Sequence, residues 1–149
     1  LTIGDDVYKL QQFHFHAPSE NEIDGHTYPL EGHFVYKTDN GKITVISILY
    51  NYGDENQALK QIWDKMPQAA NTETELSQAI SLDDFYPGDK DYYNFEGSLT
   101  TPPCTEGVNW IVFKNQETVS KEQVEKFTQT LGFENNRPIQ DTNGRKIKE

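Results

Sequence analysis

The sequence predicts a mostly β (α+β) fold with peripheral helices. Segments with the spacing of strands outnumber those with the spacing of helices. Strand signals are clearest over Val7–His16 and over the pair Glu31–Thr38 and Lys42–Tyr50. Only two segments, one near the middle and one near the C-terminus, carry apolar residues at helical spacing. Strands therefore form the body of the fold, and the helices cover it.

The first strand is expected over Val7–His16. In its second half Phe13 and Phe15 alternate with polar residues, so the two phenylalanines share one face. Gln12, His14 and His16 then share the opposite face.

The next two strands are expected to form a hairpin. Glu31–Thr38 leads into Asp39-Asn40-Gly41, a sequence that favours the positive φ angles of a tight turn. Lys42–Tyr50 returns from this turn and is nearly all apolar, which indicates a strand deep in a sheet. Further strands are expected over Tyr92–Gly97 and Val108–Phe113.

A first helix is expected over Asp54–Met66. Its apolar residues follow the spacing i, i+3, i+4 and i+7, and Pro67 is expected to end it. These residues are Leu59, Ile62, Trp63 and Met66.

A second helix is expected over Ser120–Leu131. Ser120 and Gln123 have the spacing of a capping box, and Gly132 provides a C-terminal cap. The apolar face consists of Val124, Phe127 and Leu131. The tail after Phe133 is polar and is expected to be irregular.

Composition excludes several classes of function. The chain has 149 residues, which suits one domain over 1–149, and a formal net charge of −11. This acidity argues against nucleic acid and anionic membranes as partners, because both bind clustered Lys and Arg. No apolar run approaches the roughly 20 residues of a membrane span. The first residues lack the features of a signal peptide, and the single cysteine forms no disulfide within the chain.

Three of the four histidines form a pattern typical of a metal site. His14 and His16 share a strand face, and His33 follows 17 residues later on the next expected strand. Turn-forming residues between them favour an antiparallel return, which brings the three imidazoles together. Three histidines leave the fourth tetrahedral position of zinc open, which is the arrangement of a catalytic rather than a structural site. The alternative for His14 and His16 is an exposed polar strand face.

Two other features favour the metal site. Gln12 lies on the strand face of His14, and Glu31 on that of His33, where each can accept the second N–H of a ligating imidazole. Far along the chain, Gly97–Pro103 contains Thr100 and Thr101 before two prolines, which predicts a stiff loop with fixed hydroxyl groups.

With these segments the sequence resembles the α-class carbonic anhydrases, in the bacterial form, over essentially its whole length. The matching motifs are Gln12–His16, Ser19-Glu20, Tyr28–Val35, Gly97–Cys104, Asn109-Trp110 and Arg137-Pro138; the form of Pro103–Gly107 is the bacterial one. The resemblance implies a central, largely antiparallel twisted sheet with peripheral helices. It also implies Zn²⁺ on His14, His16 and His33, and reversible hydration of CO₂ to bicarbonate by zinc-bound hydroxide.

The resemblance also implies roles for other residues. Thr100 accepts a hydrogen bond from the zinc-bound hydroxide and donates one to Glu20. Gln12, Glu31 and a backbone carbonyl near Asn135 hold His14, His33 and His16, respectively. The substrate pocket consists of Val35, Val45, Leu99, Thr101, Val108 and Trp110. We expect His26 to lie at the surface and Arg137 to anchor the tail.

The resemblance covers roughly the C-terminal two-thirds of the family domain, so we expect the chain to be N-terminally truncated. No residue takes the role of the family's proton-shuttle histidine, and the usual partner of Cys104 has no counterpart. Phe95 stands where the family commonly has Tyr. We expect a missing N-terminal segment or a second copy of the chain to complete the fold, and, from bacterial relatives, a periplasmic or secreted location.

Two other functions are considered. A zinc-binding or interaction module with impaired catalysis requires the same ligands but no turnover. A cupin-type metal protein also has a His-x-His-x-x-x-Glu motif, here from His14 to Glu20, but its Gly and Pro pattern around the last histidine is missing.

Overall fold

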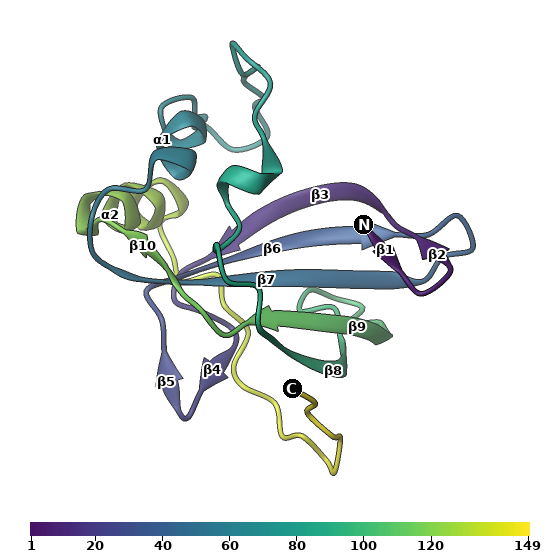
Figure 1. Ribbon diagram of the computed structural model, residues 1–149. Coiled ribbons are helices and arrows are strands. Elements are labelled where there is room, and N and C mark those ends of the chain that lie inside the picture. Colours follow the sequence, from purple (N-terminus) through teal and green to yellow (C-terminus); the bar gives the residue numbers. More distant parts are fainter.

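A twisted sheet of six strands dominates the computed structural model, which describes residues 1–149 (Figure 1). Its main path runs β3–β6–β7–β9–β8, and β10 pairs with the end of β7. The strands are β3 (Lys9–His16), β6 (Leu30–Lys37), β7 (Ile43–Tyr52), β8 (Tyr92–Ser98), β9 (Glu106–Phe113) and β10 (Glu117–Val119). Three of the pairings are antiparallel, and β7 pairs in parallel with β9 and β10. The predicted mostly β class, with a largely antiparallel sheet, is confirmed.

β7 is the central strand, as its apolar sequence predicts. It lies between β6 and β9, and Ile48, Leu49 and Tyr50 in its middle are fully buried. The hairpin of β6 and β7 turns at residues 39–41, where Gly41 has a φ of 91°. This hairpin aligns His33 of β6 with Ser47 of β7.

The pairing register assigns a different role to each face of the sheet. On one face Phe15, Phe34 and Ile46 belong to a large apolar core beneath the helices. On the other face His14 pairs with His33, and His33 pairs with Ser47 in β7. The alternation within β3 therefore puts the phenylalanines into the core and the histidines on the opposite face.

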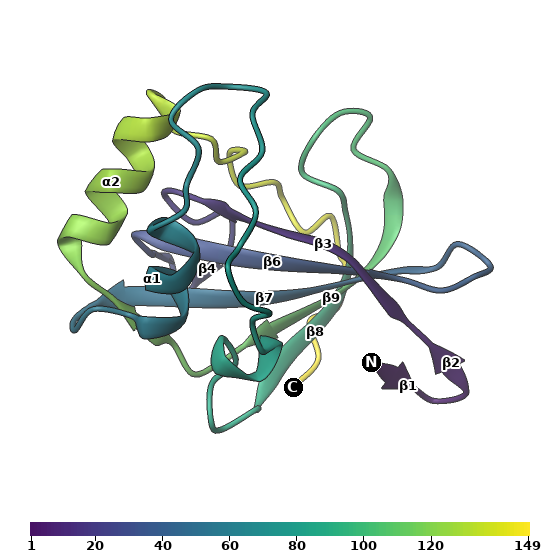
Figure 2. The ribbon, with the colours of Figure 1, turned by 90° about the horizontal axis from the view of Figure 1, so that it is seen from above.

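The helices α1 (Gln57–Trp63) and α2 (Lys121–Leu131) lie on the same side of the sheet (Figures 1 and 2). Trp63 stacks on Phe127 with a centroid distance of 5.4 Å, and its ring edge meets Phe15 at 4.9 Å. The Trp63 indole N–H donates to the carbonyl of Gln123 at 2.9 Å. These contacts attach both helices to β3 behind the histidine face.

The C-terminal helix α2 agrees with its prediction. Ser120 and Gln123 form the capping box, and Gly132 ends the helix with a φ of 78°. Glycine is favoured at this position because the left-handed conformation costs it little.

The first helix is shorter than predicted. Asn56 caps it by accepting a hydrogen bond from the N–H of Leu59, so the helix begins three residues after Asp54. After Trp63 the chain continues with tighter bonds, from Lys65 N–H to the Ile62 carbonyl and from Met66 N–H to that of Trp63. The predicted bounds Asp54–Met66 are therefore wrong by three residues at each end, and the end at Trp63 agrees with Pro67, whose ring clashes with the carbonyl four residues earlier.

Several short elements have no counterpart in the sequence-based prediction. They are β1 (Thr2–Ile3), β2 (Asp6–Val7), β4 (Glu22–Ile23), β5 (His26–Thr27) and the 3₁₀ helix η1 (Leu82–Asp84). β1 and β2 form one two-stranded hairpin, and β4 and β5 form another. None of the helices has the length and apolar character needed to cross a membrane.

Candidate metal centre

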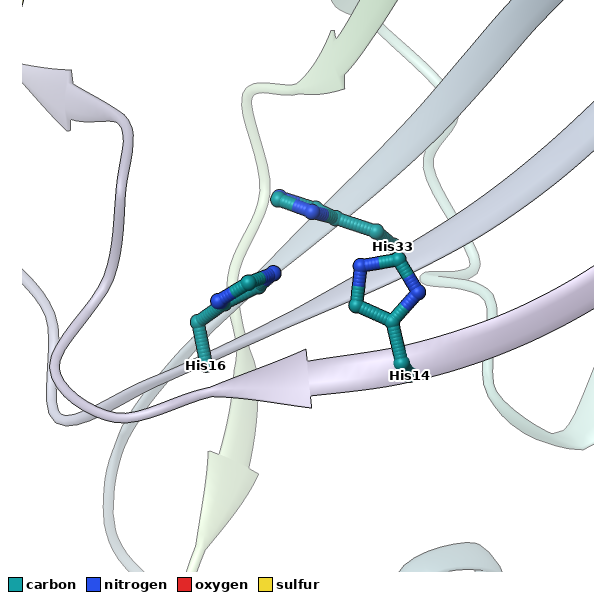
Figure 3. A group of neighbouring side chains, drawn as sticks. All are labelled: His14, His16 and His33. Atoms are coloured by element: carbon teal, nitrogen blue, oxygen red, sulfur yellow. The ribbon is translucent and has the colours of Figure 1, made fainter. Parts of the chain in front are cut away.

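Two neighbouring strands bring the three histidines together (Figure 3). His14 and His16 project from β3, and His33 projects from β6 directly opposite His14. One ring nitrogen of each histidine lies within 4.8 Å of the others, so small ring rotations allow one ion to contact all three. His16 and His33 are buried, and His14 is half-buried. The group therefore lies on a rigid sheet with one side toward solvent.

One nitrogen of each ring lies beside an oxygen atom of the protein. Nδ1 of His14 lies 2.7 Å from Oε1 of Gln12, and Nδ1 of His16 lies 2.9 Å from the carbonyl oxygen of Asn135. Nε2 of His33 lies 2.9 Å from Oε1 of Glu31, although this contact lacks the alignment of a full hydrogen bond. The nitrogens left for a ligand are thus Nε2 of His14, Nε2 of His16 and Nδ1 of His33.

The surroundings of His14 and His16 favour the neutral imidazole, the form that binds a metal. Burial, reinforced by the neighbouring histidines, lowers the pKa of His14 to about 4. Burial and His33 also lower the pKa of His16. Nε2 of His16 is buried without any hydrogen-bond partner, which suits a nitrogen that binds a metal ion through its lone pair. Neutral nitrogens, an unpartnered buried ring atom and three converging rings fit a zinc ion.

Glu31 is the most enclosed charge near the histidines. Its carboxylate is fully buried, and its Oε2 accepts the backbone N–H groups of Glu20 at 2.6 Å and Asn21 at 2.8 Å. Its Oε1 accepts hydrogen bonds from Nδ2 of Asn21 at 2.6 Å and from the hydroxyl of Ser47. Burial alone raises the pKa of Glu31, but His33 and these donors outweigh it and lower the pKa to about 2. Glu31 is therefore a fixed anion beside His33.

Glu20 lies between the histidines and a neighbouring cavity. Its Oε1 accepts the backbone N–H of Arg137 at 2.7 Å, whereas its Oε2 is buried without a hydrogen-bond partner. A cavity of about 340 Å³ is lined by Glu20, Thr100 and Trp110 among others. The structure thus brings Thr100 and Glu20 to one cavity but does not join them by a hydrogen bond. Thr101 is exposed beside them.

The apolar residues predicted to hold substrate gather in one cluster. Val45, Val108 and Trp110 are buried in it, and Val35 and Leu99 pack against it partly exposed. The Trp110 ring meets that of His33 edge-on at a centroid distance of 4.9 Å. This cluster therefore reaches the metal centre through Trp110.

The remaining residues singled out in the sequence are His26, Arg137, Cys104 and Phe95. His26 is exposed on β5, and Arg137 donates from Nη1 to the hydroxyl of Ser98 at 3.3 Å. Cys104 is a free, half-buried thiol. Phe95 stacks on Trp110 with a centroid distance of 6.2 Å.

The sequence analysis did not single out Asn21 and Ser47, the two residues whose side chains hold Glu31. The available signal for Ser47 is its polar hydroxyl within the apolar run of β7, at a position that faces the same side as Val45 and Leu49. The signal for Asn21 is weaker, because a polar residue in a loop is ordinary.

Comparison with known proteins identifies the family of this chain. Residues 2–149 match the family model described as eukaryotic-type carbonic anhydrase. A carbonic anhydrase of Pectobacterium carotovorum is 45% identical over 99% of this chain and 60% of its own length. One from Neisseria gonorrhoeae is 46% identical over the whole chain and 59% of its own length. The chain thus spans about 60% of the length of these relatives.

Solved structures show the same fold. The α-carbonic anhydrase of Thermovibrio ammonificans, in complex with the inhibitor sulfanilamide, has a TM-score of 0.95 and 46% identity. That match covers 97% of this chain and 64% of the other. A dioscorin complexed with ascorbate has a TM-score of 0.89 and 34% identity, covering 98% of this chain and 63% of the other. With a family match over residues 2–149, the chain belongs to the eukaryotic-type, or α-class, carbonic anhydrases.

Proposed function

We propose that the protein containing this chain catalyses the reversible hydration of CO₂ to bicarbonate and a proton, with one zinc ion held by His14, His16 and His33. The observation that carries this proposal is the convergence of three ring nitrogens within 4.8 Å, each on a ring whose other nitrogen faces a protein group. Zinc in a three-histidine site provides a Lewis acid that makes a hydroxide nucleophile available near neutral pH, and carbonic anhydrases are the type example.

The chain's own residues orient the ligands. Acceptors beside His14 and His16 favour the N–H on Nδ1, so the lone pair lies on Nε2 of both rings. Glu31 favours the N–H on Nε2 of His33, which leaves the lone pair on Nδ1. Each ring is therefore fixed in the tautomer that presents a free lone pair to the ion.

We assign Glu20 and Thr100 the role of orienting the nucleophile. Glu20 is 8% exposed and keeps one carboxylate oxygen without a partner, which is available to accept a hydrogen bond from the hydroxyl of Thr100 in the same cavity. The Thr100 hydroxyl has one hydrogen, so if it donates to Glu20 it can only accept a hydrogen bond from the nucleophile. That hydrogen bond fixes the direction of the nucleophile's lone pair.

The apolar cluster around Trp110 suits an uncharged substrate. Because CO₂ has no charge to pair with, it is held by contact with apolar side chains such as Val45 and Val108. We assign Val35, Leu99 and Thr101 to the same pocket.

Stopped-flow CO₂ hydration tests the proposal. The protein is assayed without metal, with one equivalent of zinc, and with zinc plus a primary sulfonamide. We expect turnover only with zinc, and we expect the sulfonamide to inhibit it. Absence of turnover in a protein that has bound one zinc contradicts the proposed activity.

A zinc-binding module with impaired catalysis is the second candidate. The observation that favours it is the missing hydrogen bond between Thr100 and Glu20, whose Oε2 has no partner. This candidate predicts zinc binding at one equivalent with no turnover, so the same assay separates the two.

Two further expectations are proposals. β3 is hydrogen-bonded to a neighbour on one side only, which supports completion of the sheet by another segment or a second copy. A periplasmic or secreted location rests on the resemblance to bacterial relatives, and cell fractionation tests it.

A further inference from the structure

We propose that Ser47 is a positioning residue of the metal centre: its hydroxyl holds Oε1 of Glu31 beside His33, so that Nδ1 of His33 stays aimed at the other two histidines. This inference rests on the proposed zinc site and goes beyond it, because Ser47 is not one of the three proposed ligands.

The register of the sheet places Ser47 next to the centre. Ser47 on β7 is the pairing partner of His33 on β6, which in turn pairs with His14 on β3. The three residues thus form one row across three strands, on the same face. Ser47 is fully buried, and its hydroxyl donates to Oε1 of Glu31. A buried hydroxyl in the apolar centre of a sheet is costly unless it is hydrogen-bonded, and this one bonds to the group that orients a ligand.

The two oxygens of Glu31 are held in different ways. Oε2 is held by two backbone N–H groups, from Glu20 and Asn21, which side-chain changes do not remove. Oε1 is held by side chains alone: Nδ2 of Asn21, the hydroxyl of Ser47 and the nearby Nε2 of His33. The rotation of the carboxylate about its Oε2 anchor is therefore set by Asn21 and Ser47.

Asn21 and Ser47 act on Oε1 from different elements. Asn21 belongs to the loop before β4, whereas Ser47 belongs to the central strand. Without the Ser47 hydroxyl, Nδ2 of Asn21 is the one remaining side-chain donor to Oε1 besides the nearby His33. Movements of the loop that carries Asn21 can then rotate the carboxylate. Because the contact from Glu31 to His33 already lacks full hydrogen-bond alignment, a small rotation of the carboxylate releases the ring.

Zinc affinity of the variant Ser47→Ala, measured by competition with a chelator, tests this role. We expect roughly tenfold weaker binding, the lower end of the effect of losing an outer partner of a ligating histidine. The matched control is Thr44→Val, which removes another fully buried hydroxyl from β7, one that accepts from Nδ2 of Asn109. Its zinc affinity is expected to stay within twofold of the unchanged protein.

A double-variant cycle with Glu31→Gln separates positioning from general destabilisation. If Ser47 acts through Glu31, then S47A has less than a twofold effect on zinc affinity in the E31Q background. The visible bands of the Co²⁺-loaded protein report ligand arrangement; they are expected to shift in S47A and not in T44V.

Equal losses of affinity in S47A and T44V, or an S47A effect undiminished by E31Q, overturn the role of Ser47. If S47A does not fold, Ser47→Cys replaces the hydroxyl with a weak donor in a side chain of the same shape. An unchanged affinity in S47C then contradicts the inference. Failure of the unchanged protein to bind one zinc contradicts the proposed function instead.

Discussion

Nδ1 of His16 lies 2.9 Å from the carbonyl oxygen of Asn135, although 119 residues separate the two in the chain. The Asn135 side chain strengthens this connection: its Oδ1 accepts from the N–H of Ala17 at 3.0 Å, and its Nδ2 donates to the carbonyl of Phe15 at 2.9 Å. The irregular C-terminal tail therefore supports the candidate metal centre, since it holds the end of the strand that carries His14 and His16.

Replacing Asn135 is expected to weaken both the fold and the metal site. Asn135→Ala removes two side-chain hydrogen bonds, which lowers the free energy of unfolding by about 1–3 kcal/mol at about 0.5–1.5 kcal/mol each. The carbonyl beside His16 is then less well held, so zinc affinity falls by about 10- to 100-fold. Urea denaturation and chelator competition measure the two effects. The control is Asn136→Ala, at a half-buried neighbour; an equal loss there contradicts the specific role of Asn135.

The histidines should differ sharply in their contribution to zinc binding. His33→Ala removes a buried ligand and is expected to reduce zinc affinity by more than the roughly 100-fold caused by losing an outer partner. His26→Ala changes an exposed residue on β5 and is expected to leave the affinity unchanged. Isothermal titration with zinc compares the two. Comparable affinities would place the ion elsewhere.

The stability of the zinc-free protein should fall in mild acid. The pKa of His14 is about 4 in the folded protein, against 6.5 as the ordinary value, and the pKa of His16 is also lowered. Between pH 6.5 and 4 the unfolded chain therefore binds more protons than the folded one, so the free energy of unfolding decreases as the pH falls. Below about pH 4 both states bind the proton of His14, and its contribution levels off.

Urea denaturation in the presence of a chelator, at pH values from 8 to 4, measures this dependence. His14→Gln is expected to show a shallower slope below pH 6.5. A slope that is the same in H14Q and in the unchanged protein contradicts the contribution of His14.

Thr100 is expected to affect turnover without affecting metal binding. Thr100→Ala removes the hydroxyl proposed to orient the nucleophile, and a loss of about 100-fold in kcat/KM is expected from misorientation. Thr100→Ser keeps the hydroxyl and should retain most of the activity. Zinc affinity should be unchanged in both variants, because Thr100 is not a ligand. Similar activity of T100A and T100S would remove the hydroxyl from the mechanism.

The free edge of β3 predicts association of the isolated chain. An eight-residue strand with one unpaired side exposes backbone donors and acceptors to other strands. Residues 68–79 are all exposed, which predicts early cleavage there by proteases. Light scattering and limited proteolysis test both expectations. A compact, protease-resistant monomer contradicts the idea that further polypeptide completes the sheet.

Local sequence patterns predicted the parts of the structure that local forces determine. Alternation in β3 separated His14 from Phe15, and the turn at residues 39–41 joined the two correct strands. The capping box and Gly132 gave the bounds of α2 to within one residue. The turn-rich segment between the strands predicted an antiparallel return that brings His33 to His14 and His16, whereas the exact register of His33 opposite His14 was not predicted.

Other features depend on contacts that no local pattern records. The start of α1 depends on Asn56, whose backbone N–H donates to Oε1 of Gln123 far along the chain. The hydrogen bond from Ser47 to Glu31 depends on the register between β6 and β7, and a one-residue shift would move Ser47 to the other face. The contact from Asn135 to His16 came from family resemblance, because the distance along the chain hides it.

X-ray diffraction at the zinc absorption edge, from crystals of the zinc-loaded protein, tests the central claim most directly. The account predicts one zinc ion bound by Nε2 of His14, Nε2 of His16 and Nδ1 of His33, the three nitrogens that the protein leaves free. A zinc ion at another place, or bound through the nitrogens that face Gln12, Asn135 and Glu31, would contradict it.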